Sequence, residues 1–184
     1  MTPYPLSKTD TGTKVLITLF LATIAVSISV AELNVRDKVK FTPAGVVARY
    51  GPEEEPVDSP AGGFAGDAAA EPTMAEEPLV ARMNTFTLLL DVTHPHVFEL
   101  PLVVFVLAHF LMRTRAASAF KLVTYFLGFG GIVLFLGTPW MVRYVALGWA
   151  PMMLVGAFLV GLASMVMIAV SLWDMWTKGK TGRR

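Results

Sequence analysis

Four long apolar runs restrict what this chain can fold into more than any other feature of the sequence. Each run lies within the range of about 17–25 mostly apolar residues that an α-helix needs to cross the hydrocarbon core of a bilayer. Lipid offers no partner to a free backbone N–H or C=O group, so each run should be helical. The sequence therefore predicts an all-α integral membrane protein with four transmembrane helices, at residues 15–31, 94–112, 119–138 and 151–173.

The first apolar run has a second interpretation, as a cleavable signal peptide. Lys8 and Lys14 precede it, and Ser29-Val30-Ala31 has the small-x-small pattern of a cleavage site. However, the run is longer than the apolar region of a signal peptide, which usually has about 7–15 residues. We therefore expect this run to be retained as a transmembrane helix.

Lysine and arginine residues are concentrated in the short segments on one side of the expected membrane. Such an excess is typical of the cytoplasmic side. The distribution predicts that both termini lie in the cytoplasm. The small size, the simple topology and the Ala/Gly/Val-rich spans favour a multi-pass protein of a bacterial inner membrane. The inner segments would be 1–14, 113–118 and the basic tail 174–184, and the outer loops 32–93 and 139–150.

The long outer loop has its own composition. Threonine is a good helix cap and proline favours the first helical position, so Thr42-Pro43 predicts a short surface helix near 43–50. Residues 51–78 are rich in proline, glycine, alanine and glutamate, which predicts a flexible acidic linker. Alternatively, this linker could become ordered by wrapping around a partner subunit.

Composition excludes several classes of function. The sequence has no cysteine, three histidines and a net charge of +1. The lack of cysteine removes disulfides, thiolate metal sites and covalently attached haem, and the small net charge does not indicate a nucleic-acid partner. No catalytic arrangement is evident, so we expect a subunit of a larger complex rather than an enzyme acting alone.

All three histidines lie in or beside the second apolar run. Ionisable residues at membrane depth usually mark functional sites. Pro95 should occupy the first helical position, and Pro101 should kink the helix. Helical geometry places His94 and His109 about 22 Å apart along the axis and about 60° apart around it. The corresponding values for His96 and His109 are about 20 Å and 140°.

Histidines near both membrane faces of one helix resemble the arrangement in membrane b-type cytochromes. The resemblance covers this helix only. It implies contact of His94, His96 and His109 with haem b, and a role in a respiratory or photosynthetic electron-transfer complex. No other apolar run carries a histidine, so second axial ligands would come from another subunit, from a second copy of the chain, or from methionine. The methionines expected near the outer face are Met141, Met152 and Met153.

The same residues allow other interpretations. Asp91, His94, His96 and Glu99 could bind zinc, copper or iron at the outer face, if His94-Pro95-His96 is extended or forms a turn. Histidine and glutamate at a membrane face could also exchange protons with a quinone. Arg143 could hold a haem propionate, a lipid phosphate or Glu99. Finally, the histidines could serve only packing, in a scaffold subunit that anchors a larger complex.

Overall fold

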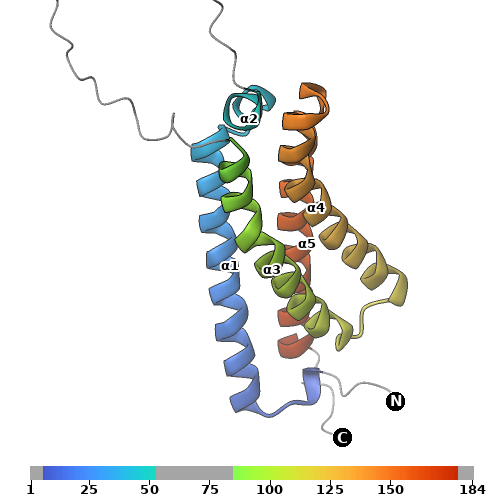
Figure 1. Cartoon of the computed structure of the whole chain (residues 1–184). Coiled ribbons are helices and arrows are strands. Elements are labelled where there is room, and N and C mark those ends of the chain that lie inside the picture. Colours follow the sequence, from blue (N-terminus) through green and yellow to red (C-terminus); the bar gives the residue numbers. More distant parts are fainter. Residues whose placement is uncertain (1–5, 53–84, 178–184) are drawn as a thin grey trace, which may run out of the picture.

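The computed structural model describes residues 6–52 and 85–177, and every regular element within these ranges is a helix (Figure 1). Four of the helices are long and apolar enough to span a membrane. The prediction of an all-α membrane protein with four transmembrane helices is confirmed. Apart from residues 51 and 52, the predicted linker 51–78 lies outside the described residues. The long helices are α1 (Thr11–Val39), α3 (Thr85–Met112), α4 (Ser118–Tyr144) and α5 (Ala150–Thr177).

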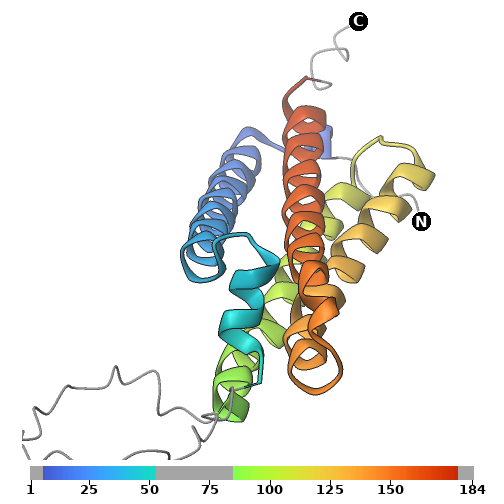
Figure 2. The ribbon, with the colours of Figure 1, turned by 90° about the horizontal axis from the view of Figure 1, so that it is seen from above.

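Three shorter elements complete the described fold: the 3-10 turns η1 (Leu6–Lys8) and η3 (Leu147–Trp149), and the helix α2 (Pro43–Tyr50). η1 lies beside the last turns of α5, whereas α2 lies at the opposite end of the bundle (Figures 1 and 2). Four spans thus bring both described ends of the chain to one side. We call this side the inner end and the α2 side the outer end. This naming follows the predicted orientation, which stays a prediction.

α4 and α5 form the most extensive helix pair because glycines allow their backbones to meet. A Cβ atom added at Gly156 would lie 2.5 Å from the backbone nitrogen of Phe135. A Cβ atom added at Gly131 would lie 2.9 Å from the backbone nitrogen of Val160. Small residues at helix contacts are typical of membrane proteins, where close packing replaces the hydrophobic effect as the driving force.

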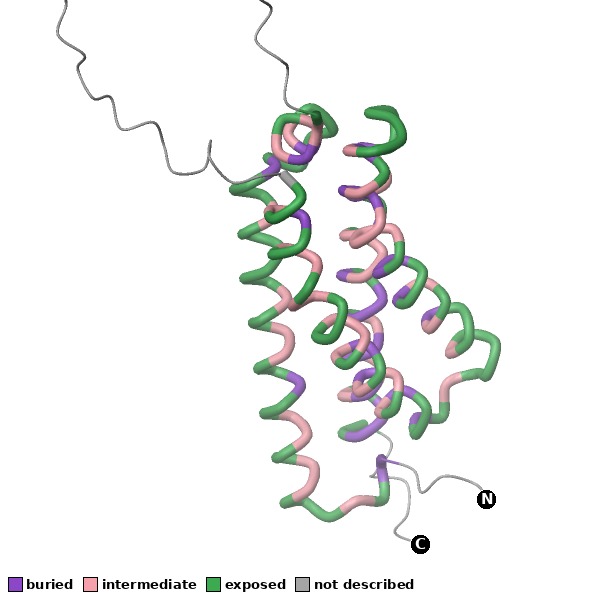
Figure 3. Tube along the Cα trace, viewed as in Figure 1, coloured by how far each residue is buried: buried purple, intermediate pink, exposed green. Residues whose placement is uncertain are grey.

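α1 lies at the edge of the bundle, and most of its residues are exposed (Figure 3). Leu21 and Val39 are its buried residues. Near the inner end, the indole N–H of Trp176 donates a hydrogen bond to Thr18 Oγ1 at 3.1 Å. Other hydroxyls on α1 donate to carbonyls four residues earlier, which satisfies polar groups that lipid could not. These hydroxyls belong to Thr23, Ser27 and Ser29.

The helices extend beyond their predicted ends. α1 continues through the candidate cleavage site at 29–31 to Val39, although retention of this helix stays a prediction. α3 begins at Thr85 rather than at residue 94, and α4 ends at Tyr144 rather than at residue 138. The expectation that Pro95 starts the second span is therefore wrong.

Pro95 and Pro101 both lie inside α3, and Pro139 lies inside α4. A proline ring has a helical φ and removes one backbone hydrogen bond, so it can kink a helix without ending it. α3 changes direction part-way along its length (Figure 1). The turns of α3 that precede Pro95 are held from outside the helix, because Trp140 Nε1 donates to Thr93 Oγ1 at 3.0 Å.

α2 closes the outer end of the bundle. Its start follows the sequence pattern, since Thr42 Oγ1 accepts a hydrogen bond from Gly45 N at 3.0 Å and Pro43 is the first helical residue. α2 buries Val46 and Tyr50 in a cluster to which every long helix contributes. The other buried members of this outer cluster are Val39, Leu89, Val142, Ala150 and Met153.

Candidate functional site

The three histidines of α3 point in two different directions. Because the helix is continuous through Pro95, side chains at positions 94 and 96 are about 200° apart around its axis. The His94 and His109 side chains are exposed, whereas His96 is partly buried and lines an internal crevice. α3 therefore offers one pair of outward imidazoles and one inward imidazole.

His94 and His109 belong to one exposed stripe along α3. Its members recur every three or four residues, which is the spacing of a single helix face. His94 lies against Phe98 in an edge contact, with ring centroids 6.2 Å apart. The stripe therefore has an imidazole toward each end and apolar, partly aromatic side chains between them. We define this α3 stripe as His94, Phe98, Leu102, Phe105, His109 and Met112.

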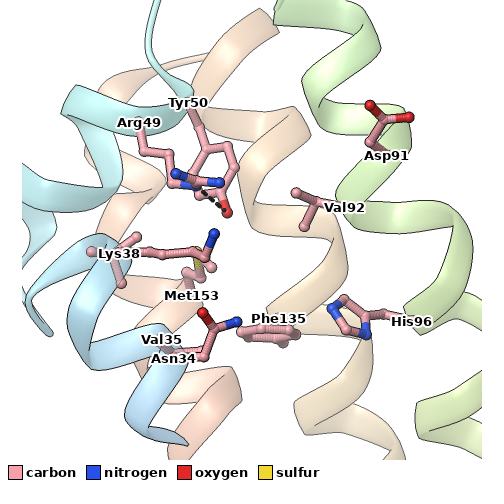
Figure 4. A pocket seen from close by; sticks show the side chains of 11 residues that line it. Asn34, Val35, Lys38, Arg49, Tyr50, Asp91, Val92, His96, Phe135 and Met153 are labelled. Carbon is pink, nitrogen blue, oxygen red and sulfur yellow. Dashed lines mark hydrogen bonds between the residues drawn. The ribbon is translucent and has the colours of Figure 1, made fainter. Parts of the chain in front are cut away.

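His96 faces a crevice at the outer end of the bundle (Figure 4). The crevice has a volume of about 190 Å³ and is lined by residues from all five helices. Its apolar lining consists of Val35, Val39, Val92, Phe135 and Met153. Its polar lining consists of Asn34, Lys38, Arg49, Tyr50, Asp91 and His96. An apolar concave surface with a few converging polar groups is the usual form of a small-molecule site.

The imidazole of His96 has one unsatisfied nitrogen. Nδ1 is buried and has no hydrogen-bond partner among the described residues. Glu99, one turn further along α3, is the nearest carboxylate, with Oε2 at 3.6 Å from Nδ1. This separation exceeds the length of a normal hydrogen bond. Since the Glu99 side chain is 68% exposed, His96 and Glu99 form at most a weak, solvated pair.

The metal hypothesis gains no geometric support. Within residues 6–52 and 85–177, no three side chains of histidine, aspartate or glutamate come close enough to hold a metal ion. The hypothesis required Pro95 to place His94 and His96 together in a turn, and the helical path of α3 separates them instead. Asp91 and His96 line the crevice, while His94 lies on the exposed stripe.

Arg143 has a structural partner. Its Nη1 donates a hydrogen bond of 2.9 Å to the carbonyl oxygen of Gly51, the residue that caps the end of α2. Arg143 thereby ties α4 to the end of the outer surface helix. No ion pair with Glu99 is found in the described part of the chain.

The three methionines expected near the outer face have different surroundings. Met153 is buried and lines the crevice together with His96. Met141 is exposed on α4. Met152 is half-buried and does not line this crevice, so Met153 is the one of the three that lines it beside His96.

Comparison with known proteins identifies a family. Residues 40–182 match a family described as a transmembrane helical domain. The chain belongs to this family. The match extends from the end of α1 to the end of α5, so the transmembrane helical domain includes all three histidines and most of the crevice. No curated protein and no solved structure matches the chain.

Several polar residues of this transmembrane helical domain and of α1 were not singled out from the sequence. Asn34, Lys38 and Arg49 fall in the predicted outer loop 32–93, where charged and polar side chains are expected to be solvated. Only the packing of α2 across α1 and α5 brings them to one crevice (Figure 4). The four-residue spacing of Val46 and Tyr50, which puts both on one face of a helix, is a sequence signal that α2 packs against the bundle.

Proposed function

We propose that this protein is a membrane subunit of an electron-transfer complex, and that His94 and His109 contact b-type haem at the interface with a partner subunit. The observation that carries this proposal is the shared direction of the two side chains, both exposed on the α3 stripe. They are 15 residues apart, which corresponds to about 22 Å along a helix. This spacing would serve one haem toward each face of the membrane.

The chemistry of the stripe supports this proposal over simple lipid contact. An imidazole in hydrocarbon leaves polar nitrogens without partners, which costs free energy unless a ligand or another chain satisfies them. Histidine nitrogen is also a common axial ligand of haem iron. Phe98 and Phe105 lie between the two histidines and provide aromatic surface that packs well against a flat ring.

The proposal requires a partner chain. The whole sequence has three histidines, all on α3, so it provides one outward imidazole at each level. The second axial ligand of each haem would come from a neighbouring subunit or from a second copy of this chain. A haem can be held between two chains in this way only if the histidine of each chain is exposed on the surface of its helix.

Optical spectroscopy of the detergent-solubilised native complex tests the proposal. The dithionite-reduced wild-type complex should show the Soret and α bands of b-type haem. His94→Ala and His109→Ala should each remove part of the α-band absorbance. His96→Ala is the matched control, because this residue is on the same helix but faces the crevice, and its spectrum should match the wild type. Unchanged spectra in both His94 and His109 variants would contradict haem contact and favour a scaffold role.

A further inference from the structure

We propose that the outer crevice binds the phosphate headgroup of a phospholipid, with Lys38 and Arg49 as the principal anion-binding residues. Lys38 comes from the last turns of α1 and Arg49 from α2. Both side chains extend into the same part of the crevice, near the Tyr50 hydroxyl (Figure 4). The site is independent of the haem contact proposed above, since the outward histidines do not line it.

The cationic side of the crevice is arranged to accept an anion. Arg49 Nε donates to Tyr50 Oη at 3.3 Å, and the guanidinium lies 5.6 Å from the centre of the Tyr50 ring. These contacts orient the guanidinium and leave its terminal nitrogens available as donors. Among the described residues, no hydrogen bond or ion pair engages the side chains of Lys38 or Asn34. Their donors therefore also remain available to a ligand with several oxygen atoms.

The charge of the crevice selects for an anion. Lys38 and Arg49 carry two positive charges, and Asp91 on the α3 side carries one negative charge. Since Asp91 comes from a different helix than either cation, the positive charge is concentrated on the α1 and α2 side (Figure 4). A phosphate group would bind on that side.

The position and lining of the crevice indicate an amphiphile rather than a free anion. Its apolar residues continue the outer cluster of the bundle, so they would contact glycerol and acyl carbons next to the headgroup. Trp140 stacks on Tyr144 at the same end, with ring centroids 6.1 Å apart. Such aromatic side chains are typical of the membrane–water boundary, where phospholipid phosphates lie. A soluble phosphate would gain nothing from the apolar lining.

Native mass spectrometry of the full-length chain in detergent tests the proposal. Dioleoyl phosphatidylglycerol is the probe, and dioleoylglycerol, which lacks the phosphate, is the comparison ligand. The wild type should retain phosphatidylglycerol at least about tenfold more strongly than the double variant Lys38→Gln, Arg49→Gln, as expected for the loss of charge-assisted hydrogen bonds. Lys40→Gln is the matched control, because Lys40 is a nearby cation that does not line the crevice, and it should bind like the wild type.

Two further measurements make the outcome decisive. Arg49→Lys keeps the positive charge and should retain most of the binding, and circular dichroism should show that every variant remains helical. Equal retention of phosphatidylglycerol by the double variant and the wild type would overturn the proposal. Equal binding of dioleoylglycerol would also overturn it, because the phosphate would then be irrelevant. Displacement of the lipid by millimolar inorganic phosphate would show a site for soluble phosphate and would overturn the assignment to a lipid.

Discussion

Replacement of Gly156 by alanine should destabilise the bundle, because the added methyl group has no room between α4 and α5. Its Cβ would lie 2.5 Å from Phe135 N, 2.8 Å from Gly131 O and 2.9 Å from Phe135 Cα. All three atoms belong to the backbone of α4, so no side-chain rotation can relieve the overlap. The two helices would have to separate by about 1 Å to restore ordinary van der Waals contact near 3.5 Å.

The expected magnitude follows from two opposing terms. Overpacking of a well-packed contact typically costs about 1–3 kcal/mol. Alanine is a better helix former than glycine, which returns up to about 1 kcal/mol. The overpacking term should win at Gly156, because rigid backbone surrounds the new methyl group. We expect the free energy of unfolding to fall by about 1–2 kcal/mol.

Reversible unfolding in bicelles, followed by circular dichroism, measures this difference. Gly130→Ala and Gly137→Ala are matched controls on α4, since a Cβ at either position meets no atom within 4 Å. These variants should be neutral or slightly stabilised. A Gly156→Ala protein as stable as the two controls would refute the conclusion that backbone contact between α4 and α5 holds the fold together.

Two other contacts give direct predictions. Asp10→Ala should fray the start of α1, because Asp10 Oδ2 accepts a hydrogen bond from Thr13 N at 2.9 Å. Asp10→Asn is the control, since asparagine also caps helices well. Faster amide exchange of residues 11–14 in Asp10→Ala than in Asp10→Asn would confirm the prediction. The hydrogen bonds from Thr13, first from its hydroxyl and then from its backbone, lower the pKa of the Asp10 carboxyl below its usual 3.8. This cap should therefore be fully effective above that value and be lost as the pH falls through the lowered pKa, which carboxyl NMR shifts would follow. Arg143→Met should remove the hydrogen bond to Gly51 O and speed amide exchange in α2 by several-fold, with no change in α5. An equal change of the exchange rates in α2 and α5 would contradict the conclusion that this hydrogen bond holds α2 to α4.

The helix predictions were accurate where a helix depends on residues close together in the sequence, and less accurate where it depends on contacts with other helices. Spanning helices were predictable because apolar length and the lack of backbone partners in lipid act locally. The start of α2 was predictable because Thr42 and Pro43 act within one turn. Helix ends were less predictable. Pro95 suggested the start of one span, and the third span was expected to end at residue 138, before Pro139. Both helices continue through these prolines, and the hydrogen bond from Trp140 to Thr93 holds the turns that precede Pro95.

The candidate sites divide in the same way. The helical period alone predicted that His94 and His109 lie nearly on one face of their helix, since both belong to a single continuous element. Which of the histidines would face outward was decided by the packing of α3 against its neighbours. Only that packing turned His96 toward the crevice.

The sequence by itself determined the class of the protein and its four membrane spans, because lipid imposes the same length and polarity on every spanning helix. Tertiary structure decided which polar groups meet. Asn34, Lys38, Arg49 and His96 are brought to one crevice by three different helices, and Arg143 finds its partner at Gly51 rather than at Glu99. Contacts between residues far apart in the chain depend on how whole helices pack, and no local pattern in the sequence records that.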